Sequence, residues 1–129
     1  MVLLAMLFAC TSGSEDAVER IAPTEVPGLL ARASPEVHIV ALWAMWCGPC
    51  LEEVEVLRTL RKRGARVSLV NIDSQAQYER KAAPWLAERD WSSVGMYRLD
   101  ARDPVTALSR AVPDWGGGLP YTVVLRPNG

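Results

Sequence analysis

The sequence predicts a single α/β domain built around a buried sheet. Residues 39–46 are unbroken apolar sequence, which is typical of a central strand buried on both faces of a parallel or mixed sheet. The next apolar residues recur at helical spacing, at Leu51, Val54, Leu57 and Leu60. Strand and helix patterns then alternate along the chain, as they do in α/β proteins. With 129 residues, half of them hydrophobic, the chain is long enough for one core.

The first half of the chain predicts four elements. We expect a short helix at about 25–33, a strand over 38–45, a helix over 48–63 and a second strand over 66–72. The charges of the longer helix follow its dipole, because acidic residues crowd its first turns and basic residues crowd its last, before Gly64. The basic cluster within 58–63 is therefore interpreted as a solvated helix end.

The second half of the chain carries clear helix starts. Ser74 and Gln77 have the spacing of a capping box, which predicts a helix over about 75–89, kinked or split at Pro84. Asp103 and Pro104 suit the N-cap and first position of a helix over 104–110. We expect short strands at 96–98 and 121–125 and a loop over 111–118. No internal repeat is present.

The feature that indicates chemistry is the pair Cys47 and Cys50, three residues apart where the strand meets the helix. A sulfur at a helix N-terminus lies beside unpaired N–H groups and the positive end of the dipole, so Cys47 should ionise readily. Cys50, one turn later, can then attack a mixed disulfide formed at Cys47. Gly48 allows close approach of a partner, and Pro49 suits the first helical position. We predict thiol–disulfide exchange, with Cys47 attacking and Cys50 resolving.

The segment from Leu42 to Cys50, Leu-Trp-Ala-Met-Trp-Cys-Gly-Pro-Cys, resembles the active-site segment of the thioredoxin superfamily. It is most similar to the TlpA/ResA-type lipoprotein thiol–disulfide oxidoreductases, because Cys50 is followed by Leu-Glu-Glu and an aliphatic helix, and the chain begins with a hydrophobic leader. The resemblance implies a thioredoxin-like fold, a three-layer sandwich with a central mixed sheet.

A second matching stretch runs from Gly118 to Leu125 and resembles the part of this fold where a cis-proline precedes a strand facing the CxxC motif. The resemblance gives that role to Pro120. It also implies a substrate-binding surface made by Trp46, Gly48, Pro49, Leu119 and Pro120. Trp43 is expected in the core. For Trp46 and Trp115, two roles remain open: packing within the domain and contact with a partner.

Two positions depart from the family. Its members carry a buried acidic residue six positions before the first cysteine, which assists proton transfer at the resolving cysteine, and Ala41 stands there in this chain. In addition, the sequence ends at the turn signal of residues 126–129, where the family continues with a strand and a helix. We therefore expect the domain over 23–129 to lack the final strand and helix.

The N-terminal residues resemble a bacterial lipoprotein signal. Val2 to Ala9 form an apolar run that is too short to span a bilayer and has the size of a signal-peptide core. The segment ending at Cys10 resembles a lipobox, so we expect a signal peptide over 1–10, lipidation of Cys10 and a flexible tether over 11–22. Lipidation would account for the third cysteine. A secretory signal of another type and a plain apolar segment are the alternatives.

Two other classes of site receive little support. A CxxC pair can be half of a zinc site, but zinc takes four ligands, and the other candidates are Cys10 and the distant His38, interpreted as an ordinary strand-end residue. We therefore predict no metal and no cofactor beyond the redox-active disulfide Cys47–Cys50. The net charge of −1 gives no indication of nucleic-acid binding.

The predicted function is reduction of protein disulfides outside the cytoplasm by a membrane-tethered oxidoreductase. The resemblance implies protein thiol or disulfide substrates, among them apocytochrome c, and a membrane electron donor. Two alternatives remain: a non-catalytic or truncated remnant or adaptor, and a disulfide isomerase or oxidant.

Overall fold

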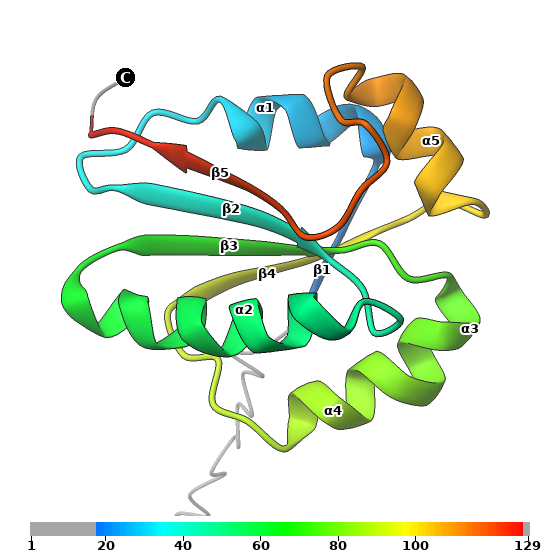
Figure 1. The fold of residues 1–129 in the computed structure, drawn as a ribbon, viewed down its shortest axis with the longest axis horizontal. Helices are drawn as coiled ribbons and strands as arrows, with labels where there is room; N and C mark the ends of the chain where they lie inside the picture. Colours follow the sequence, from blue (N-terminus) through cyan, green and yellow to red (C-terminus); the bar gives the residue numbers. More distant parts are fainter. Residues whose placement is uncertain (1–17, 128–129) are drawn as a thin grey trace, which may run out of the picture.

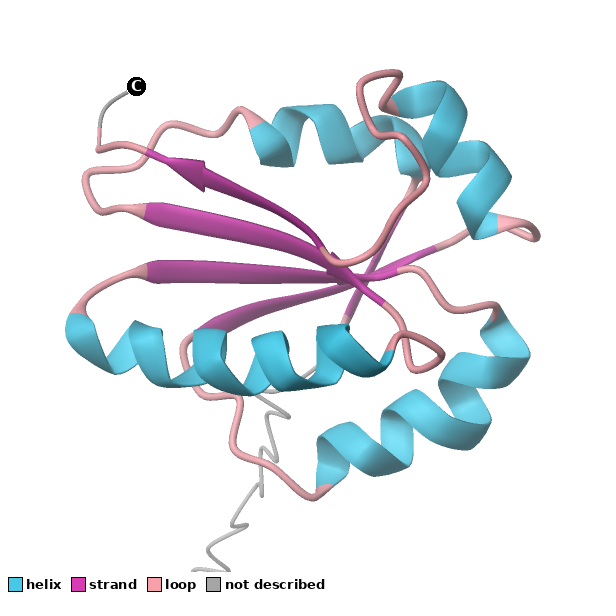
Figure 2. Cartoon of the chain, viewed as in Figure 1, coloured by secondary structure: helices cyan, strands magenta, loops and turns pink. Residues whose placement is uncertain are grey.

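A five-stranded mixed sheet forms the middle layer of the computed structural model, which describes residues 18–127 (Figures 1 and 2). The strands lie in the order β1-β4-β3-β2-β5. Four of them run parallel, and β5 is antiparallel to β2. Their bounds are β1 Glu19–Ile21, β2 His38–Trp43, β3 Arg66–Asn71, β4 Val94–Leu99 and β5 Tyr121–Leu125. The prediction of an α/β fold with a central mixed sheet is confirmed.

The central strand β2 has all six residues buried, as its unbroken apolar sequence predicts. Its side chains alternate between two cores. Ile39, Ala41 and Trp43 belong to one core, whereas Val40 and Leu42 belong to the other.

Helices cover both faces of the sheet (Figure 2). One face carries α2 (Gly48–Leu60) and a helical segment made of α3 (Gln75–Gln77), a π-helical turn at Tyr78–Ala82 and α4 (Ala83–Ala87). The other face carries a 3-10 turn at Pro23–Glu25, α1 (Val26–Leu30) and α5 (Pro104–Ala111).

Helix α2 agrees closely with its prediction. It passes into a 3-10 turn at Arg61–Arg63 and ends at Gly64, whose φ of 92° is the left-handed conformation that glycine adopts without strain. Asp103 and Ser74 are N-caps, each accepting a hydrogen bond from the backbone N–H three residues later.

The predicted helix over 75–89 ends at Ala87, and its irregular part precedes Pro84. Proline lacks the N–H that would bond the carbonyl four residues earlier, and its ring crowds that carbonyl. The chain responds with a wider turn, in which the N–H of Ala83 donates to the carbonyl of Tyr78.

Several other boundaries differ from the prediction: β2 ends at Trp43 instead of residue 45, and β3 ends at Asn71 instead of residue 72. The first helix ends at Leu30, and β4 extends over 94–99, beyond the predicted 96–98. The tether predicted over 11–22 is wrong at its end, because Glu19–Ile21 form an edge strand parallel to β4. This strand is too short to show a sequence pattern, and pairing with β4 creates it.

The predicted signal peptide over 1–10, with Cys10, and the first part of the tether lie outside the described residues. Between residues 18 and 127, no helix is long and apolar enough to cross a bilayer.

Candidate redox-active site

The two cysteines form a disulfide at the N-terminus of α2, with their Cα atoms 5.2 Å apart. Cys47 is the N-cap of the helix, and its sulfur lies 3.2 Å from the backbone nitrogen of Cys50, from which it accepts a hydrogen bond. Cys47 is 6% exposed and Cys50 is fully buried. The cysteine predicted to attack is thus the less buried of the two.

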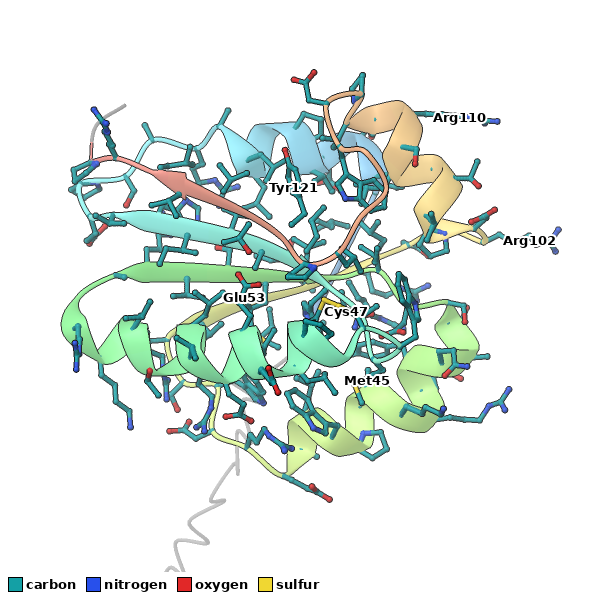
Figure 3. All side chains as sticks on the ribbon, viewed as in Figure 1. Met45, Cys47, Glu53, Arg102, Arg110 and Tyr121 are labelled. Carbon is teal, nitrogen blue, oxygen red and sulfur yellow. A yellow bond between two sulfur atoms is a disulfide. The ribbon has the colours of Figure 1, made fainter. Side chains whose placement is uncertain are left out.

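Gly48 and Pro49 lie exposed between the cysteines, with Pro49 in the first helical turn as predicted. A Cβ atom added to Gly48 would meet nothing within 4 Å, so the space around this residue is open. Cys47 and Met45 lie at the carboxyl end of β2, where the chain enters α2 (Figure 3).

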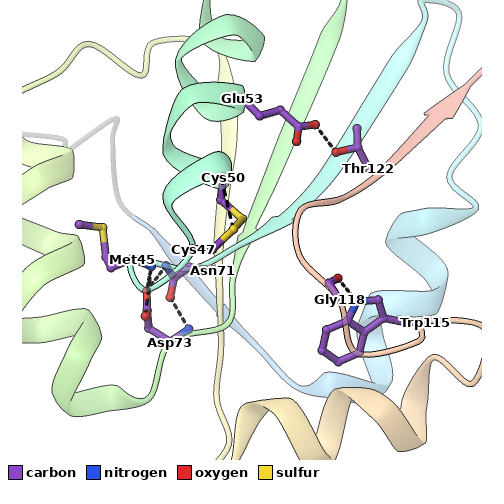
Figure 4. Close-up of a disulfide and its surroundings, with 9 residues drawn as sticks. All are labelled: Met45, Cys47, Cys50, Glu53, Asn71, Asp73, Trp115, Gly118 and Thr122. Carbon is purple, nitrogen blue, oxygen red and sulfur yellow. Dashed lines mark hydrogen bonds between the residues drawn. A yellow bond between two sulfur atoms is a disulfide. The ribbon is translucent and has the colours of Figure 1, made fainter.

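The turn that leads into Cys47 is held at three points. The N–H of Cys47 donates to the carbonyl of Ala44 at 3.1 Å, and the N–H of Ile72 donates to the carbonyl of Trp43 at 2.9 Å. The N–H of Met45 donates to the two carboxylate oxygens of Asp73, at 2.9 and 3.2 Å (Figure 4).

Asp73 is the residue that the sequence analysis missed. Its side chain is 3% exposed, and burial raises its pKa, while hydrogen bonds from Asn71 and from the N–H of Met45 act in the opposite direction. Asn71 is the last residue of β3 and Asp73 follows it, next to the end of β2, from which the chain continues to the cysteines. Polar residues at the carboxyl end of a buried parallel strand are a signal that could have identified them.

Pro120 lies where the resemblance placed it. The Leu119–Pro120 peptide bond is cis and immediately precedes β5. Because Tyr121 pairs with Leu42 near the end of β2, Pro120 is brought to the end of the sheet that carries the disulfide. Leu119 is partly buried and packs against both cores.

The three tryptophans of the predicted site region differ in their surroundings. Trp46 is 58% exposed beside Cys47, so its ring is accessible to a partner. Trp43 is buried, as predicted, and packs on Trp85 with ring centroids 5.7 Å apart. Trp115 is buried and its indole N–H donates to the carbonyl of Gly118 at 2.8 Å, which anchors the loop before Leu119.

Glu53 is a second residue that the sequence analysis did not assign to the site. Its place in the first turns of α2 indicates only a charge that the helix dipole favours. Its carboxylate accepts a hydrogen bond from the hydroxyl of Thr122, which links α2 to β5 two residues after Pro120 (Figure 4).

The position six residues before Cys47 is occupied by Ala41, which is buried in β2 and supplies no carboxylate to the site. Among residues 18–127, Asp73 is the buried carboxylate, and no group of three or more His, Cys, Asp or Glu side chains is arranged to hold a metal.

His38 lies at the other end of β2 and differs from the prediction of an ordinary strand-end residue. Its side chain is completely buried, and its Nε2 atom lies 2.8 Å from the hydroxyl of Ser68 on β3. Parallel pairing of β2 and β3 produces this contact, because it places Ser68 opposite Val40, two residues from His38.

Comparisons with known proteins support the fold. No protein-family model and no curated protein matches the chain. A similar solved structure is the crystal structure of a protein from Chlorobium tepidum that is provisionally named thiol:disulfide interchange protein DsbE. The two chains are 23% identical, with a TM-score of 0.50. The match covers 74% of this chain and 63% of that one, so this chain spans less than two thirds of its structural neighbour.

Proposed function

We propose that this chain, a thioredoxin-like domain with a disulfide at the start of its second helix, is a thiol–disulfide oxidoreductase. The observation that carries the proposal is the asymmetry of the cysteine pair. Cys47 caps α2 and lies nearer to solvent, whereas Cys50 is fully buried one turn later. A redox pair needs one sulfur that meets the partner and one that is protected until it resolves the mixed disulfide.

The reaction follows from this geometry. In the reduced protein, the Cys47 thiolate attacks one sulfur of a substrate disulfide, and the other substrate sulfur leaves as a thiolate that takes up a proton. Cys50, as a thiolate, then attacks the Cys47 sulfur of the mixed disulfide. The substrate leaves as a dithiol, and Cys47 and Cys50 end as the disulfide seen in the structure. Two electrons pass from the protein to the substrate.

The surface around Cys47 suits a protein substrate. Trp46, which precedes Cys47, is exposed, and so are Gly48 and Pro49, which follow it. The backbone at Leu119 and Pro120, at the same end of the sheet, completes the proposed docking surface. This arrangement lets a polypeptide approach the disulfide without displacing core side chains.

The finer assignment rests on the resemblance and on the N-terminal sequence. We place the protein outside the cytoplasm, in the periplasm of a bacterium, held at the membrane by a lipid on Cys10. Its substrates are then exported proteins, including apocytochrome c, and a membrane electron donor re-reduces it. The TlpA/ResA type and the reducing direction belong to this proposal. The name of the Chlorobium tepidum protein agrees with thiol–disulfide interchange in general.

Substitution of each cysteine tests the proposal. Cys47→Ser should abolish reduction of a protein disulfide such as that of insulin, because no sulfur remains to attack. Cys50→Ser should instead accumulate mixed disulfides between Cys47 and the substrate, because nothing resolves them. Mass spectrometry of alkylated samples identifies these adducts.

Cys10→Ser is the matched control, since it removes the remaining cysteine and leaves the pair intact. It should retain wild-type exchange. Full activity in both Cys47→Ser and Cys50→Ser would show that the assignment is wrong. A folded wild-type protein with an intact disulfide and no exchange would instead support the non-catalytic adaptor.

A further inference from the structure

Asp73 is a buried carboxylate that the exchange reaction does not itself use. Its side chain receives hydrogen bonds from the N–H of Met45 and, at 2.7 Å, from the side-chain amide of Asn71. The carbonyl oxygen of that amide in turn accepts from the N–H of Asp73 at 2.9 Å. The two side chains therefore orient each other at the end of β3.

The hydrogen bond at Met45 reaches the segment that carries the nucleophile. Met45 is the second residue of the four-residue turn closed by the bond from the N–H of Cys47 to the carbonyl of Ala44. A partly buried N–H at this position needs an acceptor, and the carboxylate of Asp73 supplies it from another strand. A charged acceptor makes a stronger bond than a neutral one.

Burial of a carboxylate is costly and is tolerated where specific donors satisfy it. Here the donors are a side chain that orients Asp73 and a backbone N–H two residues before Cys47. Ala41, buried in β2 six residues before Cys47, provides no carboxylate. Asp73 thus brings a negative charge to this end of the sheet by a different route, from the neighbouring strand.

We infer that Asp73 is a positioning residue for thiol–disulfide exchange: its carboxylate, oriented by Asn71, holds the Met45 N–H and so fixes the turn that presents Cys47 to a substrate. This inference rests on the proposed function. It assigns a role in the reaction to a side chain that does not touch the substrate.

The charge of Asp73 and its hold on the turn before Cys47 can be tested separately, because losing the charge and losing the hold should change the reactivity of Cys47 in opposite directions. Removing the negative charge near Cys47 should favour its thiolate, since a like charge opposes ionisation. Loosening the turn should slow attack on a protein disulfide, which requires an aligned sulfur. The positive charge of Lys81, on the following helical segment, acts on Asp73 and is unchanged in the variants below.

The test compares the full-length chain with Asp73→Asn, which keeps the shape of the side chain and removes its charge. One carboxylate oxygen accepts both from the Met45 N–H and from the Asn71 amide, and the second oxygen lies 3.2 Å from the Met45 nitrogen. An amide oxygen at the first position keeps both bonds but turns its NH2 group toward the Met45 N–H, which weakens the hold on the turn. Two rates are measured in the reduced protein: iodoacetamide alkylation of Cys47 as a function of pH, and exchange with insulin. Asp103→Asn is the matched control, because an asparagine also caps a helix and Asp103 serves α5 on the other face of the sheet.

We expect the alkylation profile of Cys47 to move to lower pH in Asp73→Asn while exchange at neutral pH slows about tenfold. Asp103→Asn should match the wild type in both. A purely structural role would lower the melting temperature and leave both rates unchanged, and this result would overturn the inference. If the wild type shows no exchange, the proposed function fails, and the alkylation profile still tests the link from Asp73 to Cys47.

Asn71→Ser keeps the inference testable if Asp73→Asn does not fold. It removes the amide that orients the carboxylate and leaves the charge in place. We expect exchange to slow about threefold to fivefold, with the alkylation profile unchanged. Wild-type exchange in folded Asn71→Ser would contradict the positioning role.

Discussion

At the scale of single residues, the buried polar side chains of residues 18–127 include one pair that joins two neighbouring strands. His38 is completely buried with its Nε2 atom against the hydroxyl of Ser68, far along β2 from the cysteines. Burial lowers its pKa below the usual value, because the charged imidazolium is poorly solvated there. The folded protein therefore holds His38 neutral at pH values at which the unfolded chain takes up a proton.

This difference predicts a loss of stability on mild acidification. Above the unfolded pKa of 6.5, His38 is neutral in both states and its stabilising contribution is fully present. As the pH falls through 6.5 toward the lower folded pKa, the unfolded state binds the proton first, and the free energy of unfolding decreases. Urea denaturation of the oxidised protein at pH 7.5 and pH 5.5 measures the change.

His38→Gln should show a smaller decrease over the same pH range, since glutamine does not titrate and can still bond the Ser68 hydroxyl. Asp73 contributes with the opposite sign, because a raised folded pKa makes the native state bind the proton first. Equal pH dependence in the wild type and in His38→Gln would show that His38 is not the titrating group.

At the scale of elements, local capping signals decide where helices begin. The carboxylate of Asp103 accepts from the N–H of Thr106 at 3.2 Å and from its hydroxyl at 2.7 Å, and Pro104 occupies the first turn of α5. These hydrogen bonds lower the pKa of Asp103, which stays ionised beside the positive end of the helix dipole.

Loss of this cap should destabilise the domain moderately. Asp103→Ala leaves the N–H of Thr106 without its acceptor, and we expect the free energy of unfolding to fall by about 1 kcal/mol. Urea denaturation at neutral pH measures this value. Asp114→Ala is the control, because Asp114 is exposed and makes no hydrogen bond within residues 18–127. A loss of the same size in Asp114→Ala would mean that capping is not the cause.

At the scale of the whole molecule, one sheet separates two cores that share the central strands. Leu69 lies in the core beneath α2 and α4, and Leu42 lies in the core beneath α1 and α5. Both side chains are fully buried. Because β2 and β3 contribute residues to both cores, neither core can lose its packing without disturbing the same strands.

We therefore expect the two cores to unfold together. Leu69→Ala and Leu42→Ala should each lower the free energy of unfolding by about 2–5 kcal/mol, the cost of a cavity in a packed core. Each variant should retain a single transition when fluorescence and circular dichroism are compared. Two separate transitions in either variant would show that the faces of the sheet are independent.

Sequence patterns predicted those parts of the fold that depend on neighbouring residues. The apolar run before Cys47 predicted β2, and the charges and Gly64 of the next segment predicted the extent of α2. The resemblance placed a cis-proline at Pro120. The edge strand β1 escaped prediction because three residues carry too little pattern.

The candidate site was predicted only in part, because sequence patterns report on neighbouring residues and several contacts of the site join distant ones. By itself, the sequence determined that two cysteines stand at the start of a helix after a buried strand, because helix caps, dipoles and apolar runs act over a few neighbouring residues. Only the tertiary structure decided that Asp73 binds the turn before Cys47, that Glu53 meets Thr122, and that His38 meets Ser68. These contacts join residues 28, 69 and 30 positions apart, and the order and register of β3, β2 and β5 create them.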